Sequence, residues 1–272
     1  MAADDSNNVP WINPVKRKLA AGEAVFGLTL TVASVDVAAH AACMGFDFLW
    51  IEMEHSPITL ETLRHMVLAT RGLPAVPIAR VPVNEVWTAK RVLDAGVFGV
   101  VFPFTSTPEL AAQAVSACRY PPHGTRGSGP VLAKFCWPGG ENRYHESADS
   151  NILVVAIIEQ REGVERIEEI AATPGLDVLF IGTSDLSFSL GLRGGQNHPQ
   201  LREAIARIVE AAKRHGKYLG APAWDAAQVA HYREQGFQLF QANTELGLMA
   251  MGARQILGDR RPAATAKSGA IY

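Results

Sequence analysis

The chain has few cysteines and no excess of positive charge, and each absence excludes a class of protein. Its three cysteines, Cys43, Cys118 and Cys136, are odd in number and far apart in the sequence. This spacing fits neither a disulfide framework nor a zinc site, so reduced thiols in the cytoplasm are expected. The 25 Lys and Arg residues face 27 Asp and Glu residues. No positive field is available to hold a phosphate backbone, so nucleic acid is not an expected partner.

Long apolar segments are also missing. Apolar residues make up 48% of the chain but come in short runs. None approaches the roughly 20 residues that a helix needs to cross a bilayer. The first ten residues, MAADDSNNVP, are polar and acidic, unlike the basic and then apolar start of a signal peptide. We therefore expect a soluble cytoplasmic protein with no membrane partner.

The sequence does contain a regular alternation of short apolar runs and amphipathic segments, which is typical of βα units around a parallel sheet. Eight strands are expected, at residues 24–31, 46–53, 75–81, 98–103, 152–159, 177–182, 217–223 and 237–243. The alternative, an open doubly wound sheet, is disfavoured because no early Gly-rich phosphate loop is present. The pattern predicts one (β/α)8 TIM barrel domain over residues 1–272, a usual size for this fold.

The segments between the strands carry helix signals and one interruption. Helical patterns begin after Thr59, Thr107 and Asn197, which we interpret as N-caps. Residues 119–151 are rich in Gly and Pro, and a loop of that length predicts a lid, a binding loop or an interface arm. The tail from residue 258 has little to bury and is expected to be flexible. An apolar-faced final helix before it is expected to pack on a neighbouring subunit.

Two acidic residues stand where apolar strands end. Glu159 closes the run ILVVAIIE, and Asp185 follows the run DVLFIG. Burying a carboxylate without a partner is costly, so two carboxylates at neighbouring strand exits suggest a shared cation. The alternative is that each carboxylate caps the helix that follows it. The position at strand ends favours the metal-dependent enzyme.

In a parallel barrel the reactive groups gather at the carboxyl ends of the strands, and further candidates pass this test. The second strand ends with Glu52, Glu54 and His55, the third ends with Arg80, and Ser184 precedes Asp185. A histidine and an arginine beside carboxylates would supply an acid/base group and a fixed positive charge. Arg80 could instead be an ion-pair partner of Glu52 or Glu54, and His55 a solvated loop residue. The other histidines are interpreted as surface groups and the five tryptophans as packing.

The segments FDFLWIEMEHSP, IARV, VLDAG, RYPPHGTRGSG, VVAIIEQREG and GLDVLFIGTSDLSFSLG occur in this order between residues 22 and 257. Together they resemble the HpcH/HpaI aldolase family, the class II pyruvate aldolases typified by 4-hydroxy-2-oxoheptanedioate aldolase. The resemblance implies a (β/α)8 barrel that assembles as a homotrimer or homohexamer. It also implies reversible cleavage of a 4-hydroxy-2-oxo acid into pyruvate and an aldehyde, through a metal-stabilised enolate.

The resemblance also assigns roles to single residues. It implies that Glu159 and Asp185 bind a divalent metal ion such as Mg, Mn or Co. The backbone at Ser184 and Asp185 would hold the substrate carboxylate, Arg80 would stabilise the enolate, and His55 would act as base. Asp94, in RVLDAG, would raise the basicity of His55. By its place before the fourth strand, Asp94 would lie at the opposite end of the barrel, so this contact would cross a subunit interface.

Three departures from the family pattern concern the pocket. Glu52 stands where the family usually has aspartate, Thr29 where many members have tryptophan, and Ile157 where a glutamine normally contacts the substrate. A more apolar pocket is expected, and with it a larger or less polar aldehyde than succinic semialdehyde. Three other hypotheses of function stay open. They are an oxaloacetate decarboxylase or macrophomate-synthase-like enzyme, a malyl- or citryl-CoA lyase type, and a barrel that binds a keto acid without turnover.

Overall fold

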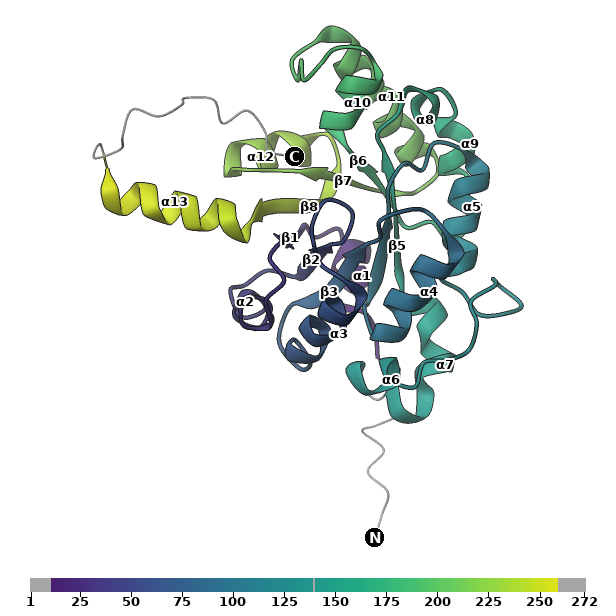
Figure 1. Cartoon of the computed structure of the whole chain (residues 1–272). Helices are drawn as coiled ribbons and strands as arrows, with labels where there is room; N and C mark the ends of the chain where they lie inside the picture. Colours follow the sequence, from purple (N-terminus) through teal and green to yellow (C-terminus); the bar gives the residue numbers. More distant parts are fainter. Residues whose placement is uncertain (1–10, 139, 259–272) are drawn as a thin grey trace.

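The computed structural model describes residues 11–138 and 140–258, in which eight parallel strands close into a barrel in the order of the sequence (Figure 1). The strands are β1 Val25–Leu30, β2 Phe48–Glu52, β3 Val76–Arg80, β4 Gly99–Phe102, β5 Leu153–Ile158, β6 Val178–Ile181, β7 Tyr218–Pro222 and β8 Phe237–Thr244. Each lies within or next to its expected range. The (β/α)8 TIM barrel prediction is confirmed.

Thirteen helices lie in the described residues, and most of them surround the barrel. They are α1 Pro14–Ala20, α2 Val35–Ala41, α3 Leu60–Ala69, α4 Val86–Ala95, α5 Pro108–Ala117, α6 Ala133–Cys136, α7 Gly140–Asn151, α8 Arg161–Glu165, α9 Ile167–Ala171, α10 Thr183–Ser189, α11 Pro199–Arg214, α12 Ala226–Glu234 and α13 Glu245–Leu257. Thr59 and Thr107 cap α3 and α5 as expected. The cap of α11 is His198 and not Asn197, because the His198 ring nitrogen accepts the Gln200 N–H at 3.2 Å.

The strands of the barrel are buried on both faces, as expected for a parallel sheet covered by helices. Every residue of β2, β4, β5 and β6 is buried. The rings of Trp50 on β2 and Phe180 on β6 pack 5.0 Å apart. At Gly27 on β1, a side chain would collide with the buried ring of its register partner Phe48 on β2, so glycine makes room for this ring between the paired strands.

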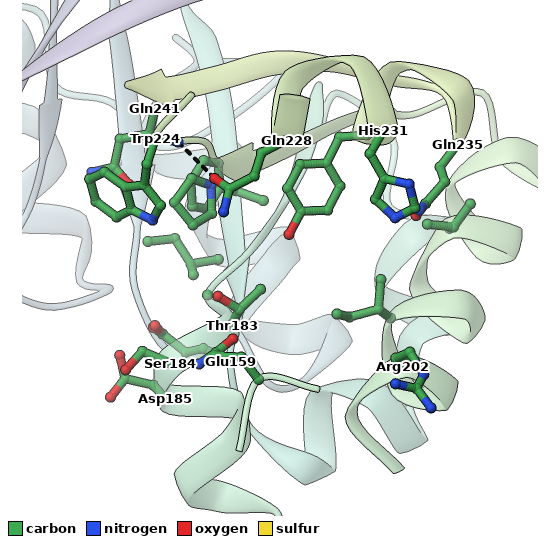
Figure 2. Close-up of a pocket in the computed structure, with 18 of the residues that line it drawn as sticks. Glu159, Thr183, Ser184, Asp185, Arg202, Trp224, Gln228, His231, Gln235 and Gln241 are labelled. Atoms are coloured by element: carbon green, nitrogen blue, oxygen red, sulfur yellow. Dashed lines mark hydrogen bonds between the residues drawn. The ribbon is translucent and has the colours of Figure 1, made fainter. Parts of the chain in front are cut away.

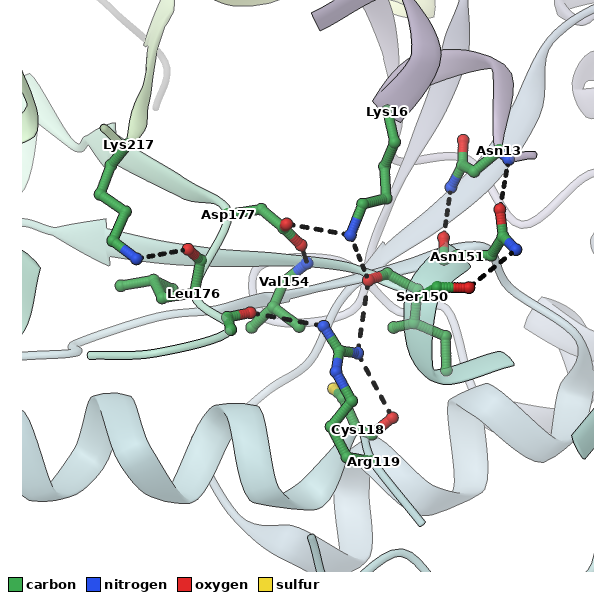
Figure 3. A network of polar contacts seen from close by, with 12 residues as sticks. Asn13, Lys16, Cys118, Arg119, Ser150, Asn151, Val154, Leu176, Asp177 and Lys217 are labelled. Carbon is green, nitrogen blue, oxygen red and sulfur yellow. Dashed lines mark hydrogen bonds and ion pairs between the residues drawn. The ribbon is translucent and has the colours of Figure 1, made fainter. Parts of the chain in front are cut away.

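A network of buried and partly buried polar groups closes the amino end of the barrel (Figure 3). The Asp177 carboxylate accepts hydrogen bonds from the Lys16 ammonium at 2.9 Å and from the Val154 N–H at 2.8 Å. The Asn13 amide donates to the carbonyl groups of Phe98 and Asn151, at 3.0 and 2.8 Å. These contacts tie α1 to the starts of three strands.

Residues 119–151 also pack at the amino end and are not one continuous loop. They include α6 and α7, and the Arg126 side chain, which precedes both helices, is fully buried against the ring of Tyr120, at 4.6 Å. The ring of Trp137 packs on those of Trp11 and Phe98, at 5.1 and 4.9 Å. No described residue of this segment lines the large pocket at the carboxyl end of the barrel, and a role as a lid, a binding loop or an interface arm stays a prediction.

The end of the chain extends away from the barrel. Helix α13 projects beyond the ring of helices (Figure 1), and Glu245 is its only buried residue. The helix ends at Leu257, and residues 259–272, which make up nearly all of the tail expected to be flexible, lie outside the described residues. None of the described helices is both long and apolar enough to span a bilayer.

Candidate active site

A pocket of about 1020 Å³ opens at the carboxyl end of the barrel. Six of the seven predicted site residues line it: His55, Arg80, Ile157, Glu159, Ser184 and Asp185. They come from four strand ends that the closed barrel brings together, as the strand-end rule predicts. Figure 2 shows Glu159, Ser184 and Asp185 on one wall, facing Trp224 and Gln241 across the pocket.

Glu159 is a buried carboxylate at the end of β5, with 3% of its surface exposed. Its Oε1 accepts the backbone N–H of Phe104 at 2.7 Å. The pKa of Glu159 is raised to about 7, chiefly by burial and also by the negative charges of Glu54 and Asp185, against the lowering effects of the Phe104 N–H and of Arg80. The carboxylate does not cap α8, whose N-cap is Gln160. A cation beside Glu159 would offset the free-energy cost of burying its charged form.

Asp185 lies in the first turn of α10, immediately after β6. The N-cap of α10 is Gly182, so the cap interpretation of Asp185 is wrong. The Asp185 side chain is exposed, and its negative charge contributes to the raised pKa of Glu159. The two carboxylates thus face one pocket from neighbouring strands, one buried and one open to solvent.

The donor set fits a hard divalent cation. Carboxylate oxygens are the protein ligands that magnesium and manganese prefer, and magnesium is commonly held by one or two carboxylates, with water and substrate oxygens in the other positions. In residues 11–138 and 140–258, no three His, Cys, Asp or Glu side chains form a ready metal cage. Glu159 and Asp185 would therefore leave coordination positions open for a substrate.

Glu52 organises the other wall of the pocket. Its Oε1 accepts the backbone N–H groups of Glu54 and His55, at 2.7 and 3.1 Å. Its Oε2 accepts the Arg80 Nε at 2.6 Å and the Trp50 Nε1 at 3.3 Å. Both oxygens of this buried carboxylate are thus satisfied by the protein. Glu52 fixes the start of the His55 loop and the direction of the Arg80 side chain.

Glu54 lies between the predicted base and the predicted positive charge. Its Oε2 is 3.1 Å from Nη1 of Arg80 and 3.6 Å from Nε2 of His55. Burial raises the pKa of Glu54, and the charges of Arg80 and His55 oppose this shift. The ion pairs of Arg80 with Glu52 and Glu54 are thus confirmed, and Arg80 nonetheless faces the pocket.

Asp94 is the one predicted site residue that does not line the pocket. It lies in the last turn of α4, where its Oδ1 accepts a hydrogen bond from Nη2 of Arg126 at 3.0 Å. The Arg126 guanidinium also reaches the hydroxyl of Tyr144 at 3.1 Å. Within one chain Asp94 therefore belongs to the amino end of the barrel, and the His55 contact stays a prediction about an assembly.

Several residues that were not among the predicted site residues also line the pocket. Trp224, interpreted as packing, is 41% exposed at the pocket rim, just after β7. Thr29 lies on β1 inside the pocket, and His231, interpreted as a surface group, lines the far end on α12. The strand-end rule could have found Trp224, since it follows a predicted strand. Thr29 was singled out only by the resemblance, as a departure from the tryptophan of many family members, because a single threonine in a strand carries no chemical pattern of its own.

Comparison with known proteins agrees with this geometry. Residues 26–251 match the model of the HpcH/HpaI aldolase/citrate lyase family. A hydroxypyruvate/pyruvate aldolase of Paraburkholderia phytofirmans is 38% identical over 92% of this chain and 98% of its own length. A 5-keto-4-deoxy-D-glucarate aldolase of Salmonella arizonae is 35% identical over 92% of this chain and 97% of its own. The crystal structure of an HpcH/HpaI aldolase/citrate lyase family protein from Burkholderia cenocepacia superposes with a TM-score of 0.84 and 36% identity, covering 92% of this chain and all of that one.

Proposed function

Within the HpcH/HpaI aldolase/citrate lyase family, to which this carbon–carbon lyase belongs, we propose that the chain is a divalent-metal-dependent pyruvate aldolase. It reversibly splits a 4-hydroxy-2-oxo acid into pyruvate and an aldehyde. The observation that carries this proposal is the buried Glu159 carboxylate, which faces a large pocket beside Asp185 with only one hydrogen-bond donor from the described protein.

The chemistry divides among a few side chains. Glu159 and Asp185 would hold the cation, for which we propose magnesium, manganese or cobalt, and the bound ion supplies a Lewis acid for the keto acid. His55 takes the proton of the 4-hydroxyl group as the bond between C3 and C4 breaks. The electron pair of that bond passes to the pyruvate half as an enolate, and the Arg80 guanidinium stabilises the negative charge there. Protonation at C3 then yields pyruvate.

The remaining predicted residues would place the substrate. The first-turn N–H groups of α10 at Ser184 and Asp185 are suited to a carboxylate, because a helix N-terminus favours negative charge. Ile157, whose position the family usually fills with glutamine, gives the pocket an apolar wall. For Asp94 we propose a contact with His55 of a neighbouring subunit, which the amino-end position of Asp94 permits only between chains.

We propose a homotrimer or homohexamer for the assembly. The support is helix α13, which carries exposed apolar side chains at Leu246, Met249, Met251, Ile256 and Leu257. Ile256 is 85% exposed and Met249 70%. An apolar face of this kind on a projecting helix is typical of a protein interface. Light scattering of the wild type and of the double variant Met249→Glu, Ile256→Glu tests this, and a wild-type monomer would contradict it.

We also propose a cytoplasmic location, since all three cysteines are free thiols.

The activity is tested by following pyruvate release from a 4-hydroxy-2-oxo acid by the purified full chain, before and after treatment with a chelator. We expect activity that is lost on chelation and restored by added Mg²⁺, Mn²⁺ or Co²⁺. Activity that survives complete metal removal would contradict the mechanism. Turnover of oxaloacetate alone, with no aldol cleavage, would indicate the decarboxylase alternative, and binding of keto acids without turnover would indicate a binding protein.

A further inference from the structure

The hydroxyl group of Thr29 is a buried polar atom that the protein leaves unused. Thr29 lies on β1 with 4% of its surface exposed, and it lines the pocket. Within the described residues its Oγ1 has no hydrogen-bond partner. An unsatisfied buried hydroxyl costs roughly 1–3 kcal/mol, so it marks a place where a ligand or a water completes the hydrogen bonding.

The surroundings of Thr29 show that its hydroxyl is not part of the packing. Its register partners on the adjacent strands, Trp50 on β2 and Thr244 on β8, provide no hydrogen bond to this hydroxyl. The pairing of β1 with β8 shifts its register between Gly27 and Thr29, and irregularities of this kind often redirect a side chain beside an active site. The shift is thus a second, independent feature at the same position of the strand.

Thr31, two residues further along β1, gives an internal comparison. It lines the same pocket, but its hydroxyl donates to Oε1 of Glu245 at 3.0 Å. Its backbone N–H donates to the same oxygen at 2.7 Å. Thr31 therefore connects β1 to the start of α13, whereas the hydroxyl of Thr29 is available to a ligand in the pocket.

We propose that Thr29 is a specificity-determining residue whose hydroxyl hydrogen-bonds to a hydroxyl group of the substrate. The enzyme would then favour hydroxylated substrates over their deoxy analogues, since a deoxy substrate leaves the buried Thr29 hydroxyl unpaired. Sites that bind a substrate hydroxyl reject analogues lacking it more strongly than apolar pockets reject an added one. This inference rests on the proposed aldolase function and refines the expectation of a generally apolar pocket.

The substrate hydroxyl could belong to either half of the aldol pair, and matched substrates distinguish the two. The donor pair is hydroxypyruvate and pyruvate, each with glycolaldehyde as acceptor. The acceptor pair is glycolaldehyde and acetaldehyde, each with pyruvate. For each pair the ratio of kcat/KM values is measured for the wild type, Thr29→Val, Thr29→Ser and Thr31→Val. Valine keeps the shape of threonine and removes only the hydroxyl.

We expect Thr29→Val to lower the preference for the hydroxylated member of one pair about tenfold, the size of one lost hydrogen bond. Thr29→Ser should keep that preference, and Thr31→Val should leave both ratios unchanged within about twofold. Thermal unfolding should show Thr29→Val at least as stable as the wild type, because it removes an unpaired polar atom. Unchanged ratios in Thr29→Val, or the same change in Thr31→Val, would overturn the proposal.

A failure of the aldolase function would be visible separately, as wild-type protein that turns over none of the four substrates. Calorimetric titration with hydroxypyruvate and with pyruvate, in the presence of Mn²⁺, would then still test Thr29. Binding of hydroxypyruvate should weaken about tenfold in Thr29→Val while binding of pyruvate stays unchanged. Equal effects on the two ligands, or no effect on either, would refute the role of Thr29 in donor recognition.

Discussion

The two ends of the barrel both bury polar groups but treat them differently. At the amino end, the Asn13 amide and the Asp177 carboxylate have partners from the backbone or from a basic side chain. At the carboxyl end, Glu159 has one backbone donor and a pKa raised to about 7 by burial, and the Thr29 hydroxyl lacks a partner in the described chain. Full pairing of Asn13 and Asp177 favours stability, whereas incomplete pairing of Glu159 and Thr29 leaves room for a ligand. The contrast holds for these four residues, since the Tyr120 hydroxyl and two nitrogens of Arg126 at the amino end also lack partners in the described chain.

The largest effect is expected from Glu159→Gln, which removes the buried negative charge at the carboxyl end. Without that ligand we expect kcat/KM for aldol cleavage to fall by roughly 10³-fold, the scale of losing a group that stabilises transition-state charge. The free energy of unfolding of the metal-free protein should not decrease, because an amide is easier to bury than a carboxylate. Steady-state kinetics measure the loss of kcat/KM, and chemical denaturation measures the free energy of unfolding. A variant that unfolds more easily but keeps its activity would show that Glu159 serves stability and not catalysis.

Asn13→Ala makes the corresponding change at the amino end. It removes two hydrogen bonds to buried carbonyl groups and the side-chain cap of α1, where the Asn13 Oδ1 accepts the Val15 N–H at 3.0 Å. We expect the free energy of unfolding to fall by about 3 kcal/mol. Activity per folded molecule should stay within about twofold of the wild type. Loss of activity in the folded variant would show that the amino end also serves catalysis.

The fold was predictable because the barrel repeats one simple pattern. Each buried strand is a continuous apolar run between amphipathic segments, and a residue such as Glu159 is conspicuous at the end of such a run. The same rule places Arg80 and Asp185 at one end of the barrel, where the pocket lies. Periodicity of a strand and the direction of a parallel sheet are thus enough to gather the charged residues.

The parts that could not be predicted depend on contacts between distant segments. The polar sequence of α7 gives no sign that Tyr144 packs on the buried Arg126, so residues 119–151 read as a loop. The Asp94–Arg126 pair joins two segments that are far apart in the sequence. Whether the Thr29 hydroxyl is paired depends on the neighbours of β1 and not on β1 itself.

Binding of the cation should depend on pH through Glu159. Its pKa rises from an ordinary 4.5 to about 7 on folding. Between these values the folded metal-free protein holds more protons than the unfolded chain, so this contribution to stability is present below pH 4.5 and is lost as pH rises through 7. A cation needs the charged carboxylate, so the stabilisation that it provides should grow over the same range.

Thermal unfolding with and without millimolar Mn²⁺ measures this dependence. We expect the cation to raise Tm by roughly 4 °C or more at pH 8 and by less than about 1 °C at pH 5. Glu159→Gln is the matched control, because it removes the titrating group and should remove the shift at both values. An equal rise in Tm at pH 5 and pH 8 would show that metal binding does not depend on the charge of Glu159.

The smallest effect is expected at Phe104, whose N–H is the one protein donor to Glu159 in the described residues. Its backbone is left-handed, with φ of 48°, and its ring is 42% exposed. Phe104→Gly relieves roughly 1–2 kcal/mol of backbone strain but adds about 1 kcal/mol of chain entropy to the unfolded state, so stability should change by less than about 1 kcal/mol. Activity should stay within about twofold, because the N–H remains.

Arg193 is the matched control for this substitution, since it has a similar φ of 46° but its N–H is not the donor to Glu159. Arg193→Gly should change the free energy of unfolding by the same small amount as Phe104→Gly and leave the kinetics unaltered. Phe104→Pro removes the N–H and forbids a positive φ, so it should lower kcat/KM far more than Phe104→Gly does. If Phe104→Gly alone abolished activity, the exposed ring, and not the backbone donor, would be what the carboxyl end requires at this position.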